Sequence, residues 1–154
     1  MKYRNSLIEM KVGEIMHLAV NNPTIIKADA DMKELLFSIN KDLRTRHVYV
    51  VNEEDKLIGS VRMNAVVKYL FPYCAAITSG ISLSTRSTLN LFPDKVSDFM
   101  NKDPFFIKEN DLLETCAKVM IEEKINELPV VDDNMKLIGQ VNVYEMIEGY
   151  KTLL

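Results

Sequence analysis

The sequence predicts an α+β fold made of two βαββα repeats, and three observations support this prediction. First, KLIGSV at Lys56–Val61 returns as KLIGQV at Lys136–Val141, an offset of 80 residues. Second, the same offset holds without a gap back to Asp31 and Asp111. Third, each repeat alternates β-branched runs of strand length with stretches of helical periodicity. Similarity that keeps its order over so many residues indicates a tandem repeat.

Each repeat opens with a Val-x-x-x-Met pattern, and we refer to Val12–Met16 and Val96–Met100 as the opening segments. Both are expected to be short helices. A short strand is predicted after the following proline, at Thr24–Ile26 in the first repeat and at Phe105–Ile107 in the second.

The first long helix of each repeat is predicted to start at a capping box. Asp31 precedes Glu34 by three residues, and Asp111 precedes Glu114 in the same way. In such a box the Asp side chain accepts a hydrogen bond from an amide of the first turn, and the Glu side chain reaches back to the cap amide.

The rest of each repeat reads as a β-hairpin followed by a helix. Apolar runs of strand length flank polar turns, and helical periodicity follows. The predicted strands are Val48–Val51 with Leu57–Val61 and Leu128–Val131 with Leu137–Val141, and the predicted final helices cover about 64–70 and 144–151.

The chain is therefore divided into an N-terminal extension (1–11), a first repeat (12–70), an inter-repeat excursion (71–95) and a second repeat (96–154). Seven of the eleven residues in 78–88 are Ser or Thr. We interpret the excursion as an ordered surface segment with a short helix near 83–91, because its apolar residues give it something to bury.

Composition and charge exclude several classes of function. A formal net charge of −3 without a basic face argues against a nucleic-acid-binding protein. The longest near-apolar run, Tyr69–Ile77, is too short to insert across a membrane. Two cysteines outside any CxxC pair favour a reduced, cytoplasmic protein, and neither they nor the two histidines form a catalytic or metal-binding constellation.

These motifs together resemble the tandem cystathionine-β-synthase (CBS) domain pair, or Bateman module. The resemblance rests on Leu128–Asp132 (LPVVD), its weaker copy Val48–Asn52, the KLIGxV segments and the opening segments. It implies sheets that face each other about a pseudo-twofold axis with helices outside. It also implies a homodimeric regulatory module, not an enzyme, that binds an adenine nucleotide (AMP, ADP or ATP, with or without Mg²⁺) and signals to an effector protein through dimer geometry.

The family's ligand signature, Gly-h-x-Thr/Ser-x-x-Asp, is altered in both repeats. In the second repeat, Asn142 replaces the hydroxyl residue that meets phosphate, and Glu145 replaces the Asp that holds the ribose. In the first repeat, Arg62 stands at the hydroxyl position and Ala65 at the Asp position. Arg62 is either a phosphate ligand or an exposed charge. Asn142 and Glu145 can also act only as helix caps.

The resemblance places the adenine base in a cleft against apolar strands. The residues that would line it are Thr24, Ile26, His47, Tyr49, Ile107, Leu128 and Pro129. Acidic pairs such as Asp132-Asp133 could hold Mg²⁺, although solvated turns explain them equally well. The alternative function is a ligand-free dimerisation or docking module with degenerate sites, which Ala65 supports.

Overall fold

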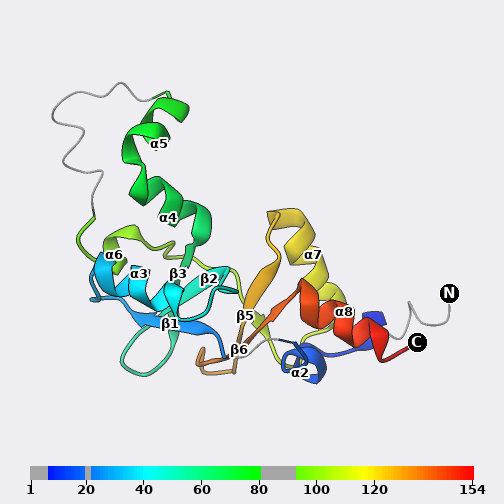
Figure 1. Ribbon diagram of the computed structural model, residues 1–154. Helices are drawn as coiled ribbons and strands as arrows, with labels where there is room; N and C mark the ends of the chain where they lie inside the picture. The colour runs from blue at the N-terminus through cyan, green and yellow to red at the C-terminus, as the bar shows by residue number, and fades with distance from the viewer. Residues whose placement is uncertain (1–6, 20–21, 81–92) are drawn as a thin grey trace. The chain divides into compact units, whose positions relative to one another are not determined.

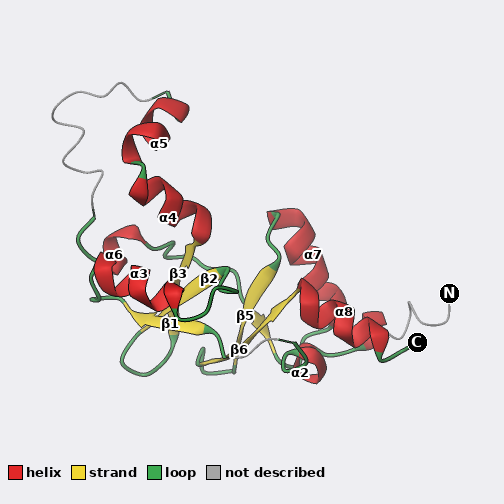
Figure 2. Ribbon diagram, in the orientation of Figure 1, coloured by secondary structure: helices red, strands yellow, loops and turns green. Residues whose placement is uncertain are grey.

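The computed structural model describes residues 7–19, 22–80 and 93–154, and it contains two compact units. Unit 1 comprises Met1–Pro23, Val51–Leu57 and Pro104–Leu154, and unit 2 comprises Thr24–Val50 and Ile58–Asp103. Two three-stranded sheets are each accompanied by helices, which confirms the predicted α+β class (Figures 1 and 2).

Unit 2 carries the sheet with strand order β1-β2-β3. Its core gathers Leu35, Val48, Val61 and Val96, all of them at most 1% exposed. The elements are β1 (Thr24–Lys27), α3 (Met32–Asn40), β2 (His47–Val51), β3 (Leu57–Arg62), α4 (Met63–Leu70), α5 (Pro72–Thr78) and α6 (Val96–Phe99).

Unit 1 carries the sheet with strand order β4-β5-β6. Strand β4 runs parallel to β5, with Ile107 opposite Val130, and β5 runs antiparallel to β6, with Glu127 opposite Asn142. The elements are α2 (Val12–Ile15), β4 (Ile107–Lys108), α7 (Leu113–Glu123), β5 (Glu127–Val131), β6 (Leu137–Asn142) and α8 (Val143–Lys151).

The offset of 80 residues found in the sequence recurs in the structure. Strands β2 and β5 begin at His47 and Glu127, and β3 and β6 end at Arg62 and Asn142. The two hairpin turns also pair within unit 1. The Leu57 amide donates to the Met135 carbonyl at 2.9 Å, and the Leu137 amide donates to the Asp55 carbonyl at 3.2 Å. This pairing explains why residues 51–57 belong to unit 1.

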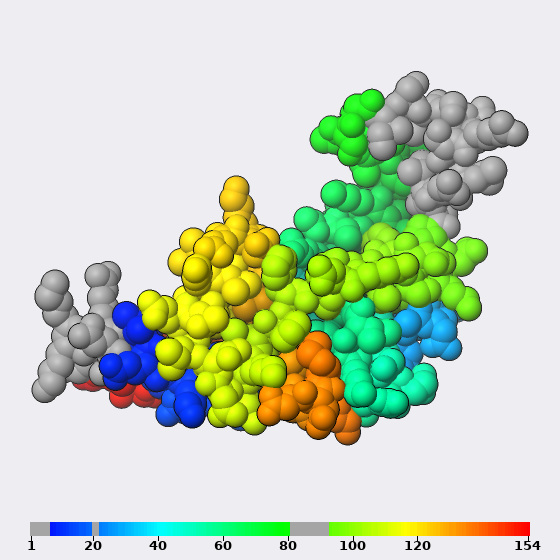
Figure 3. Space-filling model, turned by 180° about the vertical axis from the view of Figure 1, so that it is seen from behind, coloured from blue at the N-terminus to red at the C-terminus, as the bar shows by residue number. Residues whose placement is uncertain are grey.

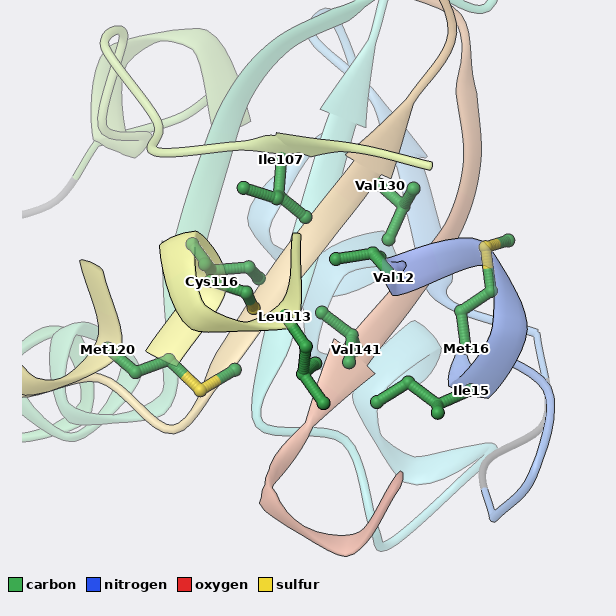
Figure 4. Packing of buried hydrophobic residues seen from close by; sticks show 10 residues of the cluster. Val12, Ile15, Met16, Ile107, Leu113, Cys116, Met120, Val130 and Val141 are labelled. Carbon is green, nitrogen blue, oxygen red and sulfur yellow. The ribbon is translucent and has the colours of Figure 1, made fainter. Parts of the chain in front are cut away.

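The opening segment of each repeat packs with the other repeat. Val12, Ile15 and Met16 of α2 are buried in the unit 1 core against the β-strands and α7 of the second repeat (Figure 4). Val96 of α6 is in turn buried in the unit 2 core, with the first repeat. Apolar side chains spaced at helical intervals drive this burial, so the two opening segments are exchanged between the repeats.

The capping-box prediction is confirmed for α3 and wrong for α7. In α3 the Glu34 amide donates to Asp31 at 2.8 Å, and the Asp31 amide donates to Glu34 at 2.9 Å. Helix α7 has Leu112 as its N-cap residue without a side-chain cap. The physical reason is the exchanged segment, because the Leu113 amide donates to the Met10 carbonyl at 2.7 Å. Asp111 instead accepts from the Lys108 amide at 2.9 Å.

The inter-repeat excursion contains α5, a helix that the sequence analysis did not predict. Pro72 occupies its first turn, where the missing amide hydrogen costs nothing. Helix α5 follows α4 directly and lies on the surface of unit 2 (green in Figures 1 and 3). The helix expected near 83–91 lies outside the described residues. The first strand of the second repeat is shorter than predicted, since β4 contains only Ile107 and Lys108.

Candidate functional site

In unit 1, the altered signature lies at the junction of β6 and α8, where it forms a capping box. Asn142 is the N-cap residue of α8, and its Oδ1 accepts a hydrogen bond from the Tyr144 amide at 2.8 Å. The Glu145 side chain is fully buried, and its Oε2 accepts from the Asn142 amide at 2.9 Å. Asn at the cap and Glu three residues later is the pairing that satisfies orphan amides at a helix start. The structure thus gives both residues a capping role.

A second buried carboxylate adjoins this junction. Glu127, at the start of β5, is 3% exposed and stands directly opposite Asn142 in the sheet register. The sequence analysis did not select Glu127. The signal that could have found it is the offset of 80 residues, because Glu127 occupies the position of His47 in the first repeat.

In unit 2, the equivalent junction between β3 and α4 is chemically different. Arg62 is partly buried at the N-cap position of α4, and no side chain caps this helix. Within the described ranges, Arg62 forms no ion pair. Ala65 stands where unit 1 has Glu145. A guanidinium beside uncapped helix amides is an environment that favours an anion.

His47 and Tyr49 lie side by side on β2 in unit 2. Their rings are parallel within 6°, with centroids 6.2 Å apart. Tyr49 is 1% exposed and His47 is 9% exposed. Both side chains therefore contribute to the packing around β2 and present little surface.

The other candidate residues are largely structural in their surroundings. The hydroxyls of Thr24 and Thr45 are hydrogen-bonded at 2.8 Å, and Ile26 packs against the unit 2 core. Ile107 and Leu128 belong to the unit 1 core, and Pro129 is buried opposite Gln140. The candidates thus fall into two sets. Unit 1 holds Ile107, Leu128, Pro129, Asn142 and Glu145, and unit 2 holds Thr24, Ile26, His47, Tyr49 and Arg62.

The acidic turn of the second repeat is engaged in an ion pair. The Asp133 carboxylate accepts from Lys108 Nζ at 2.7 Å, and this hydrogen bond holds the pKa of Asp133 below its usual value. Among the described residues, no group of three or more His, Cys, Asp and Glu side chains is arranged to hold a metal ion. No helix in the described ranges is long and apolar enough to cross a membrane.

Comparison with known proteins identifies the class. The CBS domain family model matches residues 12–72 and 96–151, and the chain therefore belongs to the CBS domain family, as a tandem pair. An uncharacterized protein of Methanocaldococcus jannaschii is 26% identical over 89% of this chain and 92% of its own length. Other curated relatives are longer, and the chain spans 44% of one and 27% of another.

Solved structures share the fold. A CBS domain-containing protein from Thermotoga maritima is 26% identical, with a TM-score of 0.70 over 92% of this chain and 94% of the other. CBSX2, solved in complex with AMP, is 21% identical, with a TM-score of 0.71 over 93% and 97% of the two chains.

Proposed function

We propose that this CBS pair is a regulatory module that binds an adenine nucleotide and passes its occupancy to a separate effector protein through the geometry of a homodimer. It acts in the cytoplasm and carries out no catalysis of its own. The likeness to CBSX2, which holds AMP in its solved structure, supports an adenosine-containing ligand.

The observation that carries the proposal is the environment of Arg62. Its guanidinium is partly withdrawn from water and forms no ion pair within the described ranges, and helix α4 begins beside it without a side-chain cap. A planar guanidinium binds a phosphate through two parallel hydrogen bonds. We therefore assign the phosphate of the nucleotide to the β3–α4 junction of unit 2.

The junction in unit 1 suits the sugar better than the phosphate. Two buried carboxylates, Glu127 and Glu145, adjoin it, and the start of α8 is already capped by Asn142. Carboxylates accept hydrogen bonds from ribose hydroxyls, whereas they repel a phosphate. We assign the nucleoside-recognition role there to Glu145, with the Asn142 amide group as an additional donor.

The test is a thermal-shift screen of the full chain with AMP, ADP, ATP, NAD and S-adenosylmethionine, each with and without Mg²⁺, followed by calorimetry. A ligand at 100 times its Kd adds about 2.7 kcal/mol of stability, which raises Tm by roughly 5–10 °C for a chain of this size. A positive result identifies the nucleotide.

Two matched pairs of variants then locate the contacts. Arg62→Ala is expected to weaken AMP binding about 10- to 100-fold, the loss of a charged hydrogen bond, and to leave adenosine binding unchanged. Lys68→Ala removes an exposed charge on the same helix and is expected to change neither. Glu145→Gln is expected to weaken binding of both ligands. Its control, Glu34→Gln, alters the capping box of α3 and should leave binding intact.

One observation favours the alternative, a ligand-free dimerisation or docking module. Asn142 and Glu145 already satisfy each other's backbone at the start of α8, and Glu145 is fully buried. Under that alternative the nucleotide screen gives no shift, and Glu145→Gln changes only the stability of the protein.

A further inference from the structure

The two units carry opposite charge. Unit 2 contains ten Lys and Arg against seven Asp and Glu, which gives +3, and unit 1 contains nine against fifteen, which gives −6. These values sum to the net charge of −3. The two repeats thus have closely matching backbones but opposite electrostatic character.

The two units also expose matching apolar helix faces. On α4 and the residue after it, Val67, Leu70 and Phe71 are between 52% and 59% exposed. On α8, the exposed face carries Val143, Tyr144, Ile147 and Tyr150. Val67 and Leu70 correspond to Ile147 and Tyr150 through the offset of 80 residues. Side chains three or four positions apart share one helix face, so each helix presents a continuous apolar stripe.

Charge differs at the edge of these stripes. Between residues 62 and 78 the only charged side chains are Arg62 and Lys68, both basic. On α8, the position equivalent to Lys68 is Glu148, which pairs with Lys151 at 2.9 Å in an exposed i,i+3 ion pair. Exposed pairs of this kind contribute little stability, so Glu148 can exchange its partner.

We propose that two copies of this chain associate head to tail, with the exposed face of α4 in one copy packed on the exposed face of α8 in the second. This arrangement rests on the homodimer in the proposed function and specifies which surfaces meet. Because a two-fold axis repeats every contact, the α4–α8 contact occurs twice in such a pair.

The unit charges determine the direction of association. Pairing like with like would bring +3 against +3 and −6 against −6, whereas head-to-tail pairing brings +3 against −6 in both contacts. A second copy is the occupant that the charges favour, since it offers to each unit a surface of matching apolar pattern and opposite sign. Complementary charge fixes orientation in this way more than it raises affinity.

Complementation between two variants tests the direction. Val67→Asp and Ile147→Asp each place a charge in one of the two stripes at a half-exposed position, and each is expected to weaken self-association at least about tenfold in sedimentation velocity. In a head-to-tail pair, mixing the two variants restores one intact α4–α8 contact, so dimer reappears in the mixture. In a like-to-like pair no contact is intact, and mixing restores nothing.

Salt dependence gives a second, independent measurement. Raising ionic strength from about 0.01 M to about 0.15 M shortens the Debye length from about 30 Å to about 8 Å. The Kd of a head-to-tail dimer is expected to rise, whereas a like-to-like dimer would tighten as repulsion is screened.

Controls separate association from folding and from ligand binding. Leu43→Asp in unit 2 and Ile121→Asp in unit 1 alter highly exposed apolar residues elsewhere and should leave association unchanged. Thermal melts establish that each variant is folded. A monomer at all concentrations, an absence of complementation or a tightening with salt would overturn the proposal. None of these measurements uses a nucleotide, so they fail independently of the proposed ligand.

Discussion

The terminal methyl group of Met16 lies over Gly139, so that a Cβ at position 139 would come within 2.5 Å of Met16 Cε. Met100 covers Gly59 in the same way in unit 2. The methionine of each opening segment thus occupies the space that a missing side chain leaves on the third strand of the other repeat. This relationship explains why the Val-x-x-x-Met and KLIGxV motifs occur together.

The two glycines are expected to differ in their tolerance of a methyl group. At Gly139 the only neighbour close to the new Cβ is the flexible end of Met16, which can move. At Gly59 the Cβ would also meet the backbone carbonyl of Asn101 at 3.0 Å, and Ser60 holds that backbone through two hydrogen bonds. We expect Gly59→Ala to cost about 1–3 kcal/mol, as overpacking does, and Gly139→Ala less. Urea unfolding of the two variants checks this, and equal costs would contradict it.

The exchange of opening segments predicts where a mutation in α2 acts. Ile15 is fully buried in the unit 1 core and lies against Gly149 of α8. Ile15→Ala should cost about 2–5 kcal/mol and should speed amide hydrogen exchange in α8 and β6 rather than in β2 and β3. Val96→Ala is the reciprocal control and should loosen unit 2. Faster exchange confined to the first repeat in Ile15→Ala would disprove the exchange.

Much of this fold could be predicted because the repeat reports it twice. Strands β2, β3, β5 and β6 were predicted to within one residue at each end, and the final helices likewise, since alternation and helical periodicity are local signals. The first α7 turn was misjudged because the partner of the Leu113 amide, the Met10 carbonyl, lies about a hundred residues away in sequence. No local pattern reveals an acceptor supplied by a distant segment.

The candidate site was less accessible to sequence reasoning. The signature positions at Arg62, Asn142 and Glu145 could be aligned with the repeat. Burial could not, because whether a carboxylate near a helix start faces solvent or the interior depends on the tertiary fold. Glu127 was missed for the same reason, since a charged residue beside an apolar strand usually lies at the surface.

The two capping boxes predict a graded loss of stability. Glu34 in α3 and Glu145 in α8 make the same hydrogen bond to their cap amides, at 2.9 Å in both cases, but Glu34 is exposed and Glu145 is fully buried. Glu34→Ala should cost about 0.5–1 kcal/mol. Glu145→Ala should cost more, because it also leaves a buried space and removes a partner from the Asn142 amide. Equal losses in thermal unfolding would argue that the buried carboxylate adds nothing beyond the cap.

The two cysteines should differ sharply in reactivity. Cys74 is exposed on α5, whereas burial raises the pKa of Cys116 to about 12, with a smaller contribution from the charge of Asp111. A disulfide-exchange reagent at pH 8 should therefore label one thiol in the native protein and two after unfolding, because the thiolate is the nucleophile. Cys74→Ser should abolish native labelling, and Cys116→Ser should leave it unchanged.

The same thiol makes stability fall at high pH. The unfolded Cys116 thiol ionises near 9.0, and the folded one near 12. Above pH 9 the unfolded state therefore binds fewer protons than the folded state, so the free energy of unfolding decreases from pH 9 towards pH 12. Cys116→Ala should flatten this part of the stability curve, and an unaltered slope would show that Cys116 ionises as easily when folded.

The exchanged opening segments have a consequence for the origin of the chain. A solitary repeat would fold around a vacant groove, and its own opening helix would have no surface of the same molecule to cover. Two separate copies could complete each other only by trading these helices, which makes the ancestral unit an obligate swapped pair. Gene fusion of such a pair would convert an intermolecular trade into an intramolecular one, and would free the two halves to diverge in charge while each still depends on the other to fold.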